Sequence, residues 1–139
     1  MRLIVDTNIL IGALFGDTSL PAHLIGLWRE GRFNLMTSGE QIDELMRVTR
    51  YPKIRERLSP ALAGRLINEL RDVAVVLKDL PAVTVCPDPY DNYLLAMSAV
   101  GAADFLVTGD KRHLLNLKLY KGAKIVSARE VLTLQRRLP

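Results

Sequence analysis

Residues 1–10, MRLIVDTNIL, decide the fold, because they place a short apolar strand directly before an acid. The run Leu3-Ile4-Val5 is continuously hydrophobic, which is typical of a strand covered on both faces of a parallel sheet. Asp6 follows at the carboxyl end of this strand, and Asn8 comes two residues later. A carboxylate directly after a buried strand has to be desolvated or bound, so we expect Asp6 to have a functional role.

Strand patterns alternate with helical patterns along the rest of the chain. Further strands are expected at residues 33–36, 73–77, 105–107 and 124–126. Helices are expected at residues 9–15, up to about 30, from 37 or 38 onward, from Pro52, after Pro60, at 90–100 and 111–117, and from Ser127 to about 137. This order predicts an α/β fold in one domain spanning residues 1–139, with a central parallel sheet of about five strands sandwiched between helices.

Composition limits the class of protein. The 139 residues are 49% hydrophobic, which is enough for a substantial core without disulfides. Cys86 is the single cysteine, so we expect a buried thiol, no structural zinc site and a reducing, cytoplasmic environment. No apolar run is long enough to cross a bilayer. The net charge of +4 is compatible with a polyanionic partner without requiring one.

Four acids occupy positions where strands give way to helices or loops. Asp6 and Asp110 come just after predicted strands, while Glu44 and Asp91 lie in early turns of predicted helices. Ligands of open parallel sheets collect at the carboxyl ends of the strands, so these acids can converge there. Oxygen-only ligation favours Mg²⁺ or Mn²⁺, which can activate water for phosphodiester hydrolysis.

Neither histidine is expected to be catalytic. His23 and His113 have no evident serine or cysteine partner in the sequence with which to form a nucleophile and base. We therefore expect hydrolysis without a protein nucleophile.

Four stretches together resemble one known family. They are IVDTNILIGALF (4–15), EQIDELMRVT (40–49), DPYDNYLLAMSAVGAADFLVTGDKRHLL (88–115) and IVSAREVL (125–132). In order and spacing they resemble the PIN-domain family, especially VapC-like toxins of type II toxin-antitoxin systems. The resemblance implies a ribonuclease whose Mg²⁺ or Mn²⁺ is bound by Asp6, Glu44, Asp91 and Asp110, in a site lined by Asn8 and Thr108. It also implies an RNA substrate, an antitoxin partner and a homodimer.

Several assignments stay open at this point. Asp88 begins an Asp-Pro-x-Asp motif and is either a further metal ligand or the cap of the following helix. Glu40 and Glu44 share one polar helix face, so only the resemblance selects Glu44, which also has Arg47 as a possible helix-face partner. Asn92 stands where some members of the family carry another acid, which leaves the number of metal ions open.

Other functions also stay open. A PIN-type nuclease can serve RNA maturation or quality control without an antitoxin, and the acids can instead form a non-catalytic metal-binding module. A receiver-like module needs an acidic pair after the first strand, where this chain has Asp6, Thr7 and Asn8.

A group of basic residues is either a rim for RNA phosphates or a set of solvated charges: Arg47, Arg50, Lys53, Arg55, Lys111 and Arg112.

Overall fold

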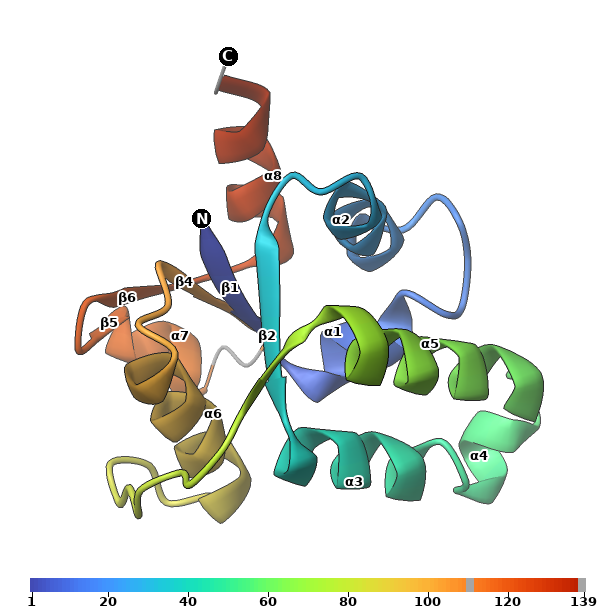
Figure 1. The fold of residues 1–139 in the computed structure, drawn as a ribbon, viewed down its shortest axis with the longest axis horizontal. Coiled ribbons are helices and arrows are strands. Elements are labelled where there is room, and N and C mark those ends of the chain that lie inside the picture. Colours follow the sequence, from blue (N-terminus) through green and yellow to red (C-terminus); the bar gives the residue numbers. More distant parts are fainter. Residues whose placement is uncertain (110–111, 138–139) are drawn as a thin grey trace.

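A central sheet with helices on both sides forms the core of the molecule (Figure 1). The computed structural model describes residues 1–109 and 112–137, and within these residues the sheet has six strands in the order β3-β2-β1-β4-β6-β5. The strands are β1 (Arg2–Val5), β2 (Asn34–Ser38), β3 (Val75–Leu77), β4 (Phe105–Val107), β5 (Leu119–Tyr120) and β6 (Ala123–Val126). All neighbours pair in parallel except β5 and β6. The predicted α/β class with a mainly parallel sheet is therefore confirmed.

Helices connect the parallel strands. They are α1 (Thr7–Gly12), α2 (Leu20–Arg29), α3 (Gly39–Val48), α4 (Pro52–Arg55), α5 (Pro60–Val73), α6 (Pro89–Val100), α7 (Leu114–Leu117) and α8 (Ala128–Arg137). Local signals start several of them. The Ser38 hydroxyl accepts a hydrogen bond from the Gln41 amide at 3.2 Å. At the start of α8, the Glu130 amide donates to the Ser127 hydroxyl and the Glu130 carboxylate accepts from the Ser127 amide, so the predicted capping box is confirmed.

Side chains that alternate along the strands build two hydrophobic layers. In β1, Leu3 and Val5 pack into a layer with α1, α2, α3, α5 and α8, while Ile4 packs into the opposite layer with α6 and α7. Figure 1 shows α6 and α7 on one side of the sheet and the other large helices on the opposite side. Every β1 side chain from Leu3 to Val5 is fully buried. This explains why the opening run is hydrophobic without alternation.

Three local details differ from the sequence-based expectations. A sixth strand is present because Leu119 and Tyr120 fold back antiparallel onto β6 through a turn at Gly122, whose φ is +89°. Helix α1 begins at Thr7 and not at Ile9, because Asp6 itself caps it. Cys86 is partly and not fully buried. Within the described residues, no helix has the length and apolar character needed to span a membrane.

Candidate active site

The site lies where the order of the strands reverses. Strand β1 sits between β2 and β4. The strands β2 and β3 follow on one side of β1, and β4, β6 and β5 follow on the other side. Asp6 follows β1 and Thr108 follows β4, and the Asp6 amide donates to the Val107 carbonyl at 2.8 Å. This arrangement brings both polar side chains to one edge of the sheet, which is the usual place for a ligand in an open α/β fold.

The carboxylate of Asp6 is buried and held by three donors. The residue as a whole is 3% exposed. Oδ1 accepts from the Asn8 amide at 3.1 Å and from the Tyr90 hydroxyl at 2.8 Å, and Oδ2 accepts from the Thr108 hydroxyl at 2.7 Å. A carboxylate can accept about four hydrogen bonds, two on each oxygen. The three donors therefore leave one acceptor position, on Oδ2, for a further ligand.

Asp91 approaches the same space from α6. It lies in the first turn of this helix and is 4% exposed, and its Oδ2 is 3.6 Å from Nδ1 of His113. The positive end of the helix dipole favours an ionised carboxylate at this position. Asp88 caps the helix by accepting from the Tyr90 amide at 2.9 Å, so the capping role is present.

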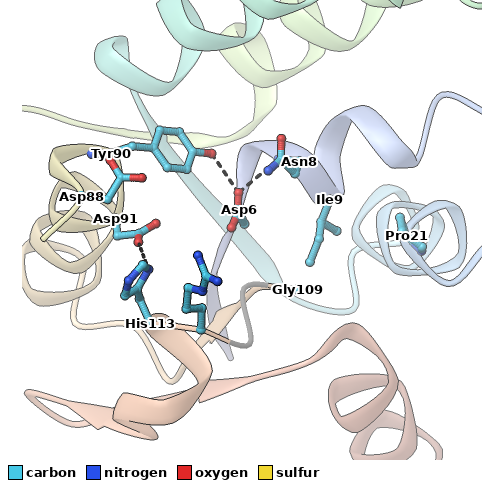
Figure 2. A pocket seen from close by; sticks show the side chains of 10 residues that line it. Asp6, Asn8, Ile9, Pro21, Asp88, Tyr90, Asp91, Gly109 and His113 are labelled. Carbon is cyan, nitrogen blue, oxygen red and sulfur yellow. Dashed lines mark hydrogen bonds and ion pairs between the residues drawn. The ribbon is translucent and has the colours of Figure 1, made fainter. Parts of the chain in front are cut away.

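Asp6, Asp88 and Asp91 open into one cleft of about 520 Å³. Figure 2 shows the Asp6 and Asp91 side chains facing this space from opposite sides, with Tyr90 above and His113 below. The wall also contains Asn8, Ile9, Pro21, Tyr90, Gly109, Arg112 and His113. The sequence therefore predicted the convergence of Asp6 and Asp91 at this edge, but it did not predict that His113 joins them.

Glu44 lies apart from this lining. Its carboxylate pairs with Arg47 along α3, so the helix-face pair that the sequence left open is present. Burial raises the pKa of the Tyr93 hydroxyl to about 12, and the charges of Glu44 and Asp6 act in the same direction. Glu44 is thus close enough to Tyr93 to affect it but does not line the cleft. Asp110, the fourth predicted acid, is outside the described residues.

Gln41, which was not among the predicted site residues, forms buried hydrogen bonds to the residues on either side of Asp6 in the sequence. Gln41 is 1% exposed, and its Nε2 donates to the Val5 carbonyl at 2.7 Å and to the Thr7 hydroxyl at 3.4 Å. Its Oε1 accepts from the Thr37 hydroxyl at 2.8 Å, and Thr7 also contacts the Tyr93 hydroxyl at 3.1 Å. A glutamine in the buried stripe of α3, beside Ile42 and Leu45, is a signal that could have revealed this group.

Tyr90 is the second missed residue. Its ring packs edge-on against the ring of Tyr93, with the two ring centroids 5.2 Å apart. Its hydroxyl donates to Asp6, which lies 84 residues earlier in the sequence. Burial, followed by the charge of Asp6, raises the pKa of this hydroxyl, so it acts as a neutral donor. No local sequence pattern distinguishes this tyrosine from a surface residue in the first turn of a helix.

Asn92 has a structural role. Its side-chain oxygen accepts from the Cys86 amide and its amide nitrogen donates to the Cys86 carbonyl, both at 2.8 Å. These two bonds close the loop that precedes α6. The side chain that replaces a possible further acid is therefore used to fix this loop.

The donors suit a hard cation in chemical type. Carboxylate oxygens from Asp6 and Asp91 line one cleft, and Mg²⁺ commonly binds through one or two carboxylates with water in its remaining positions. Among residues 1–109 and 112–137, no three histidine, cysteine, aspartate or glutamate side chains are grouped closely enough to hold an ion by themselves. The described part of the site thus offers two buried carboxylates, with Asp88 at the mouth.

Comparison with known proteins agrees with this architecture. The PIN domain family matches residues 2–112. An uncharacterized protein of Methanocaldococcus jannaschii is 25% identical over 112 residues, which cover 80% of this chain and 72% of that protein. Neither comparison separates a toxin from other members of the family. Because the match spans most of the chain, the protein belongs to the PIN domain family, whose members are generally nucleases.

Proposed function

We propose that this chain is a metal-dependent endoribonuclease. The observation that carries the proposal is the pair of buried carboxylates, Asp6 and Asp91, which come from different elements and face one cleft. Ionised carboxylates that share a site repel one another unless a cation neutralises them. PIN domain nucleases generally use divalent metals, and the oxygen donors favour Mg²⁺ or Mn²⁺.

Asp6 and Asp91 would hold the cation, and we assign Asp110 and the cap residue Asp88 as further acids of the same site. Glu44, the remaining acid that the family resemblance selects, is assigned a smaller contribution because it pairs with Arg47 and does not line the cleft. A bound divalent cation supplies an activated water and offsets the negative charge of the reacting phosphodiester. The protein contributes a fixed arrangement of acids in a partly enclosed cleft.

Neighbouring side chains prepare this arrangement. Thr108 and Tyr90 donate to opposite oxygens of Asp6, so the carboxylate keeps one orientation before substrate arrives. Arg112 and His113 line the same cleft and bring nitrogen donors to the place where a phosphate would lie. Asn8 extends the polar wall.

We assign the protein to the toxin class, inhibited by a cognate antitoxin and acting as a homodimer in the cytoplasm. The support for this class is the resemblance of residues 4–15 and 88–115 to such toxins. A PIN-type nuclease of RNA maturation is the second candidate. Growth arrest on expression, relieved by the product of an adjacent small gene, supports the toxin class. Normal growth and the absence of such a gene contradict it.

Cleavage of a pooled RNA substrate tests the chemistry. The wild type should cut with Mg²⁺ or Mn²⁺ and stop with EDTA, and Asp6→Asn should lose at least 100-fold in rate, within the range ascribed to single electrostatic contacts. The variant should still fold, because asparagine can keep its oxygen toward the Asn8 amide and the Tyr90 hydroxyl, while the Thr108 hydroxyl rotates to accept from the new amide nitrogen. Asp43→Asn, the same change at an exposed acid of α3, is the matched control. Metal-independent cleavage, or full activity in Asp6→Asn, contradicts the proposal.

The fourth acid needs its own variant. Glu44→Gln should reduce the rate less than Asp6→Asn, because Glu44 is engaged with Arg47 and does not line the cleft. An equal loss in both variants would place Glu44 among the metal ligands in the working enzyme.

A further inference from the structure

The positive charge of the chain is concentrated in one segment. Residues 47–65 contain six lysines and arginines and one glutamate, which gives a formal charge of +5. The chain as a whole carries +4, so the other 120 residues carry −1 in total. This segment comprises the end of α3, all of α4 and the start of α5, which adjoin one another in Figure 1.

A groove of about 290 Å³ lies among these three helices. We call it the α3–α5 groove, and the side chains that matter here are Thr49, Arg50, Arg55, Asn68 and Arg71. Thr49 and Asn68 are the uncharged polar residues of the lining. A planar guanidinium group matches the geometry of a phosphate and can bind it through two parallel hydrogen bonds.

The arginines of this groove are not neutralised by acids. Elsewhere, Arg29 pairs with Glu69 at 2.8 Å, and Arg47 pairs with Glu44. In the described part of the chain, no carboxylate lies within ion-pair distance of Arg50 or Arg55, and both residues are exposed. Exposed cations with no acid beside them leave a positive potential that attracts a polyanion.

Helix α3 leads from the candidate active site to the α3–α5 groove. Helix α3 begins next to the site, since Gln41 contacts the carbonyl of Val5. Arg50 lies nine residues after Gln41, which corresponds to about 13 Å along the helix axis at 1.5 Å per residue. Tyr51, which is 46% exposed, offers a ring beside Arg50 on which a base can stack. A single strand that enters the cleft can therefore reach this groove.

We propose that the α3–α5 groove binds backbone phosphates of single-stranded RNA on one side of the scissile bond. This proposal rests on the proposed ribonuclease function. An acidic protein segment is the competing occupant. Half of the lining is apolar (Met46, Pro60, Ala63, Gly64 and Ile67), and the charged residues of the groove are all arginines. RNA is favoured because each nucleotide brings a phosphate to these cations, of which Arg50 and Arg55 are exposed and have no acid beside them among the described residues.

Binding in EDTA tests the proposal without cleavage. The probe is a fluorescein-labelled 15-nucleotide RNA, and anisotropy gives its affinity between 0.1 and 1 M salt. Each phosphate contact to a single strand contributes about 0.7 to the slope of log affinity against log salt. Arg50→Gln/Arg55→Gln should therefore lower the slope by about 1.4, and weaken binding about 25-fold at 0.1 M salt and little at 1 M. The control is Lys124→Gln/Arg129→Gln, which removes two charges from exposed positions on β6 and α8.

Comparing a short with a long RNA substrate distinguishes the contribution of the α3–α5 groove from that of the catalytic centre. A trinucleotide is too short to occupy both places, so the groove variant should cleave it with unchanged kcat/KM, while its KM for a long RNA rises. An unchanged salt slope overturns the proposal, as does an equal loss in the control pair. Weaker binding of polyglutamate with unaltered RNA binding also overturns it, in favour of an acidic protein partner. If the wild type binds RNA through this groove but never cuts it, only the proposed function fails.

Discussion

Gln41→Leu is the substitution that best tests how the fold supports the site. Gln41 is buried, and its amide joins three elements: the end of β1 through the Val5 carbonyl, the start of α1 through Thr7, and β2 through Thr37. Leucine has a similar volume but makes none of these hydrogen bonds. The substitution thus removes the bonds while keeping most of the packing.

The expected loss follows from the groups left behind. The Val5 carbonyl loses a donor at 2.7 Å, and the Thr37 hydroxyl loses an acceptor at 2.8 Å. Each buried polar group that loses its partner costs about 1–3 kcal/mol, and the added apolar surface of leucine returns about 1 kcal/mol. We expect the free energy of unfolding to fall by about 1–5 kcal/mol. Because Asp6 directly follows Val5, RNA cleavage should fall as well.

Urea unfolding followed by circular dichroism measures this loss. Gln135→Leu, the same change on α8, is the matched control; within the described residues it removes only an exposed 3.7 Å contact with the Met1 sulfur and should stay within about 0.5 kcal/mol of the wild type. Thr37→Val removes the hydroxyl that donates to Gln41, so combining it with Gln41→Leu should show a coupling energy of at least about 1 kcal/mol. A loss below 1 kcal/mol for Gln41→Leu, or additive effects in the pair, refutes the reasoning.

Three further substitutions probe the contacts around the cleft. Tyr90→Phe removes a donor to the Asp6 carboxylate and should lower the free energy of unfolding by about 1.5–3 kcal/mol in urea titrations; an unchanged value contradicts the role of this bond. The pKa of Tyr93 is raised to about 12, above its usual value near 10 in an unfolded chain, so the unfolded state loses this proton first and stability falls as pH rises from 10 to 12. Tyr93→Phe should reduce that fall by about 2 kcal/mol at pH 12, and an identical alkaline profile contradicts this. Asn92→Ala breaks both bonds to Cys86 and should speed hydrogen exchange in residues 78–88, whereas equal protection in both proteins contradicts the closing role of Asn92.

Most of the fold can be predicted from the sequence because short-range signals determine the individual elements. The apolar run before Asp6 predicts β1, and Ser127 with Glu130 predicts the start of α8. The sixth strand was missed because β5 has two residues and exists only through its pairing with β6. A contact of that length leaves no periodic pattern.

The acids of the site differ in how far the sequence could place them. Asp6 was expected to be functional because of the strand before it, and the structure places it in a cleft with Asp91. Glu44 was selected by family resemblance alone, and it forms a local pair with Arg47. Its role as a metal ligand stays a prediction, as does that of Asp110.

What the sequence does not reveal is how Asp6 is held. Its hydroxyl donors, Tyr90 and Thr108, are 84 and 102 residues away, and Gln41 reaches the adjoining strand end across 36 residues. Helical and strand periodicity describe neighbours within a few positions, so such contacts become visible only once the sheet has assembled. In an aligned motif the four acids look equivalent. In the folded chain the two oxygens of Asp6 accept from Asn8 in α1, Tyr90 in α6 and Thr108 after β4, and this restraint limits the directions from which a cation can approach.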